Sequence, residues 1–121
     1  MATSVVLSAC KSNDKPAITA QNVIDGQGEM TYRVNPNSGD KVSLLGYGMM
    51  RLPIENGEDL RKNPNAQVDQ EMVNQEIDYA LEHGVNYFDT SPVYTRGRSE
   101  HTTGIALSRH PRNSYYIATK L

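Results

Sequence analysis

The sequence has a single cysteine, a small net charge and no long apolar run, and each of these features excludes a class of protein. Cys10 is the single cysteine among 121 residues, so neither an internal disulfide nor a cysteine-based zinc site can form. The formal net charge of −2 gives no electrostatic reason to expect nucleic acid as a partner. No apolar run approaches the roughly 18 residues of a membrane span. Hydrophobic residues make up 37% and charged residues 21%, which is typical of a small globular domain.

The single cysteine stands in an unusual setting. Residues 7–10, Leu-Ser-Ala-Cys, resemble the bacterial lipobox, whose cysteine is lipidated and becomes the mature N-terminus. This resemblance implies that Cys10 is a lipidation site and that the protein is a periplasm-facing lipoprotein of the cell envelope. A signal peptide also needs a basic segment and about 7–15 apolar residues, and residues 1–9 hold no Lys or Arg. Either the true start lies upstream, or Cys10 is a free thiol and the protein is cytoplasmic.

The rest of the chain divides into a linker and a folded body. Residues 11–29 are polar and without a sustained period, so residues 1–29 are interpreted as a truncated signal with its linker. The body is expected at 30–121. It begins with "MTYRV" and "KVSLLGYG" around the turn "NPNSGD", which predicts a hairpin leading into a strand over 30–48. A long loop is expected at 52–67.

After this loop the hydrophobic period changes and alternates along the chain. The spacing predicts helices at 69–83 and 99–110 and buried strands at 85–90 and 114–120. Asp69 is the expected N-cap of the first helix and Gly84 its stop. Strands that alternate with helices predict parallel βαβ units. The apolar faces of the two helices are expected to consist of Met72, Val73, Ile77, Ala80 and Leu81, and of Ile105, Ala106 and Leu107.

Three chemically active side chains follow the ends of the last two strands. Asp89 ends one strand, Tyr94 lies in the next loop and Lys120 ends the following strand, so all three are expected at one rim of the sheet. A lysine cation close to a phenol favours the phenolate, and a carboxylate keeps the lysine charged and in place. Such a set suits a phenol that gives a proton to a developing alkoxide or removes one from an alcohol. Taken singly, each residue also fits a bland role: a turn carboxylate, a loop aromatic and a solvated charge.

The motifs around these residues resemble the aldo-keto reductase family. "NYFDTSPVYTRGRSEHTTGIAL" is similar to the family signature, "SLLGYGMMRLP" to its first barrel strand and "YYIATKL" to its third strand. The resemblance covers about residues 30–121. It implies an α/β fold, the N-terminal part of a (β/α)8 TIM barrel with a preceding β-hairpin. It also implies an oxidoreductase that uses NADPH, less often NADH, to reduce a small-molecule carbonyl to an alcohol.

The resemblance further assigns roles to single residues. Tyr94 would be the acid, Lys120 the residue that favours its phenolate, and Asp89 the partner of the lysine. The segment after the first strand would line the nicotinamide end of the cleft, although its two methionines fit the core equally well and its arginine fits a solvated loop. This cofactor-binding segment consists of Gly48, Met49, Met50 and Arg51.

Two features depart from the family pattern. The family's catalytic histidine follows the next strand, and the sequence reaches only Leu121; none of His83, His101 and His110 occupies that position. A barrel typically takes about 250 residues, and this chain supplies three of the eight strands. The chain is therefore interpreted as an N-terminal fragment of a reductase, inactive and only marginally stable by itself. The alternative is a non-catalytic envelope lipoprotein or binding module with a degenerate barrel.

Overall fold

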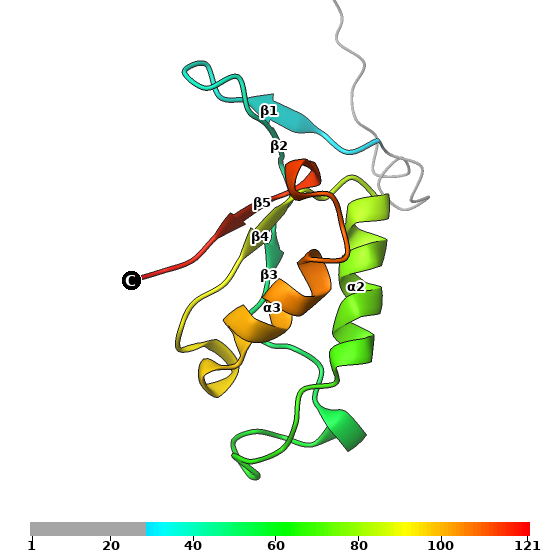
Figure 1. The fold of residues 1–121 in the computed structure, drawn as a ribbon, viewed down its shortest axis with the longest axis vertical. Coiled ribbons are helices and arrows are strands. Elements are labelled where there is room, and N and C mark those ends of the chain that lie inside the picture. Colours follow the sequence, from blue (N-terminus) through cyan, green and yellow to red (C-terminus); the bar gives the residue numbers. More distant parts are fainter. Residues whose placement is uncertain (1–28) are drawn as a thin grey trace, which may run out of the picture.

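The computed structural model describes residues 29–121, so Cys10 and almost all of the predicted linker lie outside the described residues. These described residues form a small antiparallel hairpin, a three-stranded sheet and two α-helices (Figure 1). Within the described range, no helix is long and apolar enough to cross a membrane. The strands are β1 Tyr32–Val34, β2 Lys41–Ser43, β3 Tyr47–Gly48, β4 Tyr87–Asp89 and β5 Tyr116–Ala118; the α-helices are α2 Gln70–Glu82 and α3 Ser99–Leu107; the 3-10 turns are η1 Glu55–Gly57, η2 Tyr94–Gly97 and η3 Arg112–Ser114.

The main sheet has the order β3-β4-β5 and both of its pairings are parallel. Asp89 of β4 lies opposite Gly48 of β3 and Ala118 of β5. This confirms the predicted hairpin followed by parallel βαβ units, although β4 and β5 are shorter than the sequence predicted. The backbone N–H of Thr90 still donates to the carbonyl of Ala118 at 2.8 Å, so the pairing extends one residue beyond β4.

The first helix begins and ends where the sequence predicted. The Asp69 side chain accepts a hydrogen bond from the Met72 N–H at 2.9 Å, which caps the N-terminus of α2. Gly84 follows the C-cap with a φ of 85°, a conformation that favours glycine. Met72 was expected in the core but is 49% exposed; the buried residues of α2 are Val73, Ile77 and Ala80, and Leu81 packs against the core partly buried.

The second helix differs more from its prediction. It ends at Leu107 rather than at residue 110, and Ile105, expected on its apolar face, is 39% exposed. The buried side of the helix still shows helical spacing, but it consists of hydroxyl side chains as well as Ala106 and Leu107. Its polar members are Ser99, Thr102 and Thr103.

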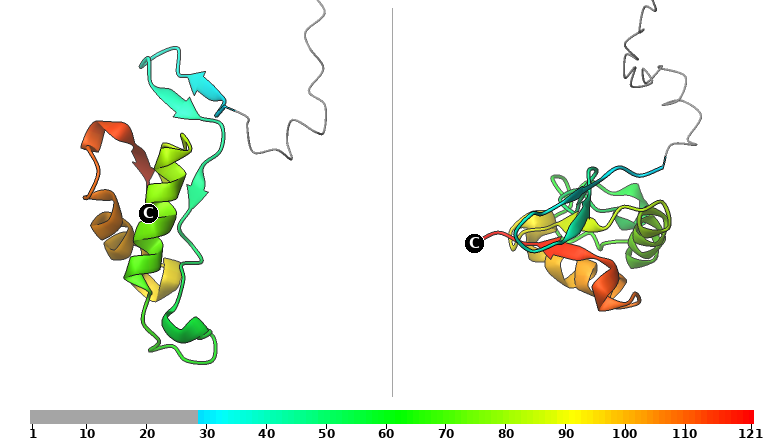
Figure 2. Two further views of the ribbon diagram at one scale, coloured as in Figure 1. Left: turned by 90° about the vertical axis from the view of Figure 1, so that its right-hand side faces the viewer. Right: turned by 90° about the horizontal axis from the view of Figure 1, so that it is seen from above.

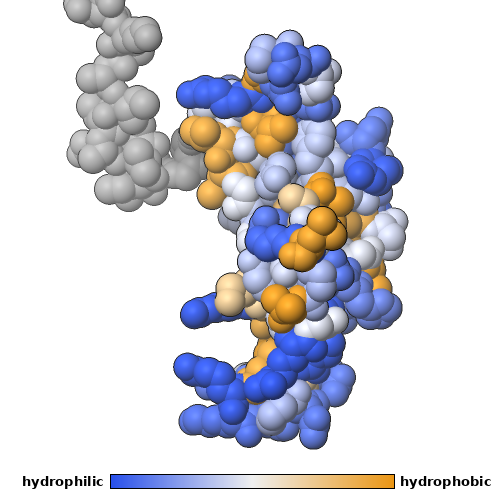
Figure 3. Space-filling view, turned by 90° about the vertical axis from the view of Figure 1, so that its left-hand side faces the viewer, coloured by the Kyte–Doolittle hydropathy of each residue, from blue (hydrophilic) through white to orange (hydrophobic). Residues whose placement is uncertain are grey.

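The core lies between the sheet and the two helices. Figure 2 shows both helices on the same side of the sheet. Phe88 of β4 is fully buried and belongs to the same core cluster as residues of α2 and α3. Because side chains alternate along a strand, Asp89 faces the opposite side of the sheet. On that side the surface is hollowed between the hairpin and the loop that joins β3 to α2 (Figure 3). The apolar members of the core are Met49, Leu52, Val73, Ile77, Ala80, Val85, Phe88, Ala106, Leu107 and Tyr115.

Hydrogen bonds of Asn86 and Tyr32 fasten the hairpin to the amino ends of the strands. Asn86, just before β4, accepts the backbone N–H of Ser43 at 2.8 Å and donates to the carbonyl of Lys41 at 2.9 Å. Tyr32 of β1 donates its hydroxyl to the carbonyl of Gly84 at 2.9 Å. The hairpin therefore closes the end of the sheet opposite to Asp89, and it leaves the carboxyl ends of the strands open.

We expect Asn86→Ala to lower the free energy of unfolding by about 1–3 kcal/mol, because it leaves two backbone groups of the hairpin without their partners. The measurement is urea unfolding followed by circular dichroism. Asn113→Ala is the matched control, since Asn113 is exposed and makes no side-chain hydrogen bond within residues 29–121; it should change stability by less than about 0.5 kcal/mol. Equal losses in the two variants would show that Asn86 does not fasten the hairpin.

Candidate active site

Asp89 and Lys120 form an ion pair across two neighbouring parallel strands. Asp89 ends β4, and Lys120 stands two residues beyond Ala118, so alternation brings both side chains to the same face of the sheet. The Lys120 Nζ lies 2.5 Å from Asp89 Oδ1, with the two side chains 45% and 42% exposed. The same ammonium donates to the backbone carbonyl of Thr90 at 3.1 Å. The predicted convergence of these two residues is therefore present.

Tyr94 completes the group from the turn that follows β4. Its backbone N–H donates to the carbonyl of Ser91 at 3.1 Å, which turns the chain back over the strand end. The Lys120 Nζ lies 4.7 Å from the centre of the Tyr94 ring, a distance typical of a cation on an aromatic face. One ammonium thus contacts both the carboxylate and the phenol, as the sequence predicted.

These contacts fix the charge of the lysine. The Asp89 carboxylate, followed by the Tyr94 phenol, raises the pKa of Lys120 above its ordinary value. The residue is therefore an ammonium ion throughout the physiological pH range. Because the folded-state pKa is the higher one, the pairing contributes its full stability below the pKa of an unfolded lysine, about 10.4, and loses it as pH rises through the folded-state value.

Lys120 is held although it lies close to the last residue of the chain. The neighbouring Thr119 points to the other side of the strand, where its hydroxyl donates to Glu100 Oε1 at 2.5 Å. Glu100 lies in the first turn of α3, so the segment after β5 is attached to a helix on one side and to Asp89 on the other.

A buried pair of hydroxyl groups joins the three elements around the site. Thr90 and Ser99 are almost completely buried, and their hydroxyl oxygens lie 2.8 Å apart. Ser99 also donates to the carbonyl of Met49 at 2.7 Å, which attaches the start of α3 to the end of β3. The sequence reasoning used Ser99 only as the start of a helix and gave Thr90 no role. The helical spacing of Ser99, Thr102 and Thr103 was the signal that could have identified the polar face.

The four residues predicted to bind the cofactor do not share one environment. Gly48 is exposed on the same face of the sheet as Asp89, and a Cβ added there would meet open space. Met50 is 55% exposed, and Arg51 is exposed as well. Met49 is fully buried in the core, so it is a core methionine and does not line the cleft. The exposed members of the set are therefore Gly48, Met50 and Arg51.

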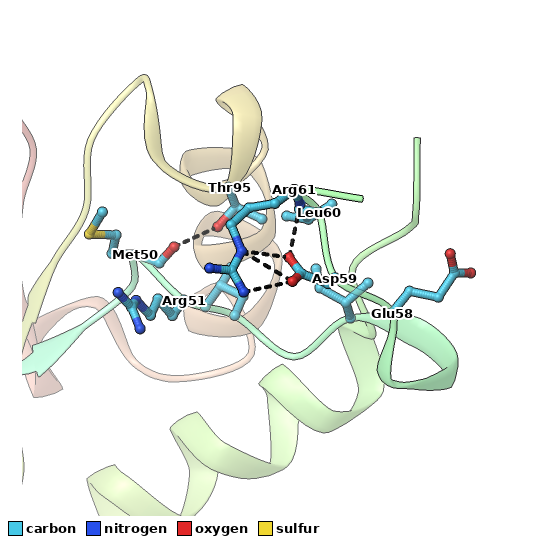
Figure 4. A pocket seen from close by; sticks show the side chains of 9 residues that line it. Met50, Arg51, Glu58, Asp59, Leu60, Arg61 and Thr95 are labelled. Atoms are coloured by element: carbon cyan, nitrogen blue, oxygen red, sulfur yellow. Dashed lines mark hydrogen bonds and ion pairs between the residues drawn. The ribbon is translucent and has the colours of Figure 1, made fainter. Parts of the chain in front are cut away.

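A cavity of about 390 Å³ opens beside these residues (Figure 4). Its wall combines the loop between β3 and α2 with Thr95, the residue after Tyr94. Both signs of charge occur in the wall, and Arg61 is already paired with Asp59, Nη2 to Oδ2 at 2.7 Å. The lining residues are Met50, Arg51, Leu52, Ile54, Glu58, Asp59, Leu60, Arg61 and Thr95. Across the described part of the chain, no group of three or more potential metal ligands comes together.

Comparison with known proteins identifies the family. The sequence profile of the Aldo/keto reductase family matches residues 44–121, which is more than half of the chain. The chain belongs to the aldo/keto reductase family. Its sheet β3-β4-β5 is accordingly the first part of a (β/α)8 barrel, and the hairpin β1-β2 precedes that barrel.

Individual relatives agree with this placement. Probable aldo-keto reductase 1 from Glycine max is 35% identical over 82 residues, which cover 68% of this chain and 21% of that protein. D-arabinose 1-dehydrogenase from Saccharomyces cerevisiae is 49% identical over 49 residues, 37% of this chain and 14% of that protein. Among solved structures, the holo form of aldo-keto reductase AKR11C1 from Bacillus halodurans superposes with a TM-score of 0.57 at 31% identity, over 77% of this chain and 26% of that chain. The chain thus spans only a minor part of the length of the relatives that it matches.

We expect Asp89→Asn to lower the pKa of Lys120, because the largest contribution to its rise disappears with the carboxylate. The measurement is an NMR titration of the Lys120 side chain between pH 8 and 12. Glu71→Gln, which removes an exposed carboxylate at the start of α2, is the control and should leave the Lys120 midpoint unchanged. An unchanged midpoint in Asp89→Asn would mean that the ion pair does not persist in solution.

Proposed function

We propose that this chain supplies the proton-transfer site of an NAD(P)H-dependent reductase that converts a small carbonyl compound to an alcohol. One observation carries the proposal: the Lys120 ammonium contacts both the Asp89 carboxylate and the ring of Tyr94. Membership of the aldo/keto reductase family supports the reaction class. The holo form of the Bacillus halodurans relative supports a bound cofactor, by analogy.

The rim of the sheet offers open space and an apolar contact for the ring of a nicotinamide. Gly48 leaves open space on the face that carries Asp89, and the exposed side chain of Met50 offers an apolar contact next to it. Gly48, Met50 and Arg51 are therefore the residues of this chain proposed to hold the nicotinamide end. When bound, the reduced nicotinamide supplies a hydride to the carbonyl carbon.

The residues of this chain handle the proton. As negative charge develops on the carbonyl oxygen, the Tyr94 hydroxyl donates its proton to that oxygen. The Lys120 ammonium stabilises the phenolate that remains, and Asp89 keeps the ammonium in place. A proton from solvent then restores Tyr94. The same groups operate in reverse on an alcohol, so the assay is to be run in both directions.

We expect Tyr94→Phe to reduce turnover by about 10²–10⁴-fold, the range usual for the loss of a positioned acid, while nicotinamide affinity changes little. The measurement is steady-state reduction of a panel of aldehydes and ketones by the protein as the cell makes it, together with a fluorescence titration of NADPH. Tyr79→Phe is the control, because Tyr79 is 65% exposed on α2 and stacks on His83, away from the site.

Equal turnover by wild type and Tyr94→Phe would refute the acid role. No turnover by the wild type would favour the alternative, a non-catalytic envelope protein or binding module. For the 121 residues expressed by themselves we propose no turnover, because the sheet has two strands with unpaired edges in the described range and its hollowed face lacks an opposing wall.

We also propose that Cys10 is lipidated and places the protein on the periplasmic side of the cell envelope, on the basis of the Leu-Ser-Ala-Cys pattern at 7–10. We expect the mature protein isolated from cells to begin at a diacylated Cys10, and Cys10→Ser to release it from the membrane fraction. The measurement is mass spectrometry of the N-terminal peptide with fractionation of the cells. An unmodified Cys10 in a cytosolic protein would contradict the proposal.

A further inference from the structure

The turn that follows Tyr94 has an uncommon backbone. Thr95 and Arg96 are both left-handed, with φ of 50° and 55°, a region that residues other than glycine rarely occupy and that is less accessible still to a β-branched residue such as threonine. Strained residues of this kind persist only where the surrounding contacts hold them, and they are often found at functional sites. Contacts with neighbouring segments are therefore expected to hold the turn of residues 95–98, called the 95–98 turn below.

The 95–98 turn reaches the loop between β3 and α2 at three separate points. The Thr95 hydroxyl donates to the carbonyl of Met50 at 3.1 Å (Figure 4). The Arg96 Nε donates to the carbonyl of Leu60 at 3.2 Å, and the Arg98 Nη1 donates to the carbonyl of Ala66. The three acceptors are all backbone groups, so the contacts fix the path of the loop between residues 50 and 66, whatever its side chains.

Burial distinguishes the contacts of Thr95 and Arg98 from ordinary surface hydrogen bonds, whereas Arg96 is exposed. Thr95 is 8% exposed, and Arg98 is half-buried beneath the loop. The Arg98 Nε also donates back to the carbonyl of Thr95 at 3.3 Å, so one guanidinium joins the turn to the loop. Its Nη2 is buried and has no hydrogen-bond partner among the described residues. Burying part of a charged group without a partner is costly, and the hydrogen bonds of Nε and Nη1 offset that cost.

The loop held in this way forms most of the wall of the 390 Å³ cavity, and Thr95 forms the rest. Tyr94 precedes Thr95 directly, so the side chains that fix the cavity wall belong to the same turn as the proposed acid. A pocket that is already formed before binding costs the ligand less ordering, which appears as higher affinity.

We propose that Thr95, Arg96 and Arg98 are positioning residues that hold the loop of residues 50–66 against the turn of Tyr94 and thereby form the binding pocket for the non-reacting part of the carbonyl substrate. This inference rests on the proposed function, since the pocket concerns catalysis only if Tyr94 is the acid. The mixed charges of the wall indicate a polar substrate that forms hydrogen bonds, rather than a hydrocarbon chain.

The kinetic test uses Thr95→Ala and Arg98→Met in the protein as the cell makes it. We expect KM for the carbonyl substrate to rise about 5–10-fold, with kcat within twofold and an unchanged pH profile. Thr95→Ser keeps the hydroxyl, so KM should stay at the wild-type value in this variant. Loss of stability alone would instead lower the active fraction, reducing apparent kcat and leaving KM unchanged.

Asn56→Gly is the matched control for backbone strain. Asn56 lies in the same loop with a φ of 55°, but its side chain makes no hydrogen bond within residues 29–121. Replacing it by glycine relieves a left-handed residue without removing a contact to the 95–98 turn. We expect KM to stay at the wild-type value in this variant. A rise equal to that of Thr95→Ala would mean that loop mobility in general, and not the three contacts, sets the affinity.

A second measurement does not depend on activity. The amides of Lys62, Asn63 and Ala66 are hydrogen-bonded within the loop, so their hydrogen exchange reports whether the loop stays closed. We expect exchange at these amides to be at least fivefold faster in Thr95→Ala and Arg98→Met, and unchanged in Tyr94→Phe. Unchanged exchange with unchanged KM would overturn the inference while leaving the role of Tyr94 intact. Full turnover by Tyr94→Phe would refute the proposed function, and faster exchange would then still support the three contacts.

Discussion

The parallel pairing of β4 with β5 is the constraint on which the candidate site depends. Its register places Asp89 opposite Ala118, and the alternation of side chains then brings Lys120 to the face of Asp89. A slip of one residue would turn Asp89 into the core and Phe88 out of it. Burial of Phe88 between the sheet and the two helices excludes that slip, so the packing of an apolar residue fixes the position of the carboxylate next to it.

The two ends of the sheet serve different purposes. At the amino ends of the strands, Asn86, Tyr32 and Gly84 attach the hairpin through neutral hydrogen bonds. At the carboxyl ends the groups are charged or strained: an ion pair, a phenol and a left-handed turn. The groups suited to proton transfer thus lie at the open, carboxyl end of the sheet. The groups at the amino end only attach the hairpin. The family placement agrees with this division, because barrels carry their sites at the carboxyl ends of their strands.

Hydrogen bonds from buried or half-buried polar side chains hold the loops at the open end. Ser99 connects α3 with β3, and Thr95 and Arg98 connect the turn after β4 with the loop before α2. On the helix side, the Tyr47 hydroxyl donates to Glu76 Oε2 at 2.9 Å, and burial together with this carboxylate raises the pKa of Tyr47 to about 12. Each bond joins elements far apart in the sequence, so the rim is held by tertiary contacts more than by local structure.

The sequence by itself determined the kinds and order of the elements, because hydrophobic period, caps and turn residues act over a few neighbours. It placed α2 between its N-cap Asp69 and the stop Gly84, and it brought Asp89, Tyr94 and Lys120 to one rim, since strand order alone decides which ends of parallel strands meet. It did not predict the polar buried face of α3 or the exposure of Met72 and Ile105, and it left open whether Met49 lies in the core. Those outcomes depend on which side chains face a partner across the core. The 95–98 turn is the clearest case: no local preference favours a left-handed threonine, and its contacts with Met50, Leu60 and Ala66, residues 32 to 45 positions away along the chain, help to stabilise it.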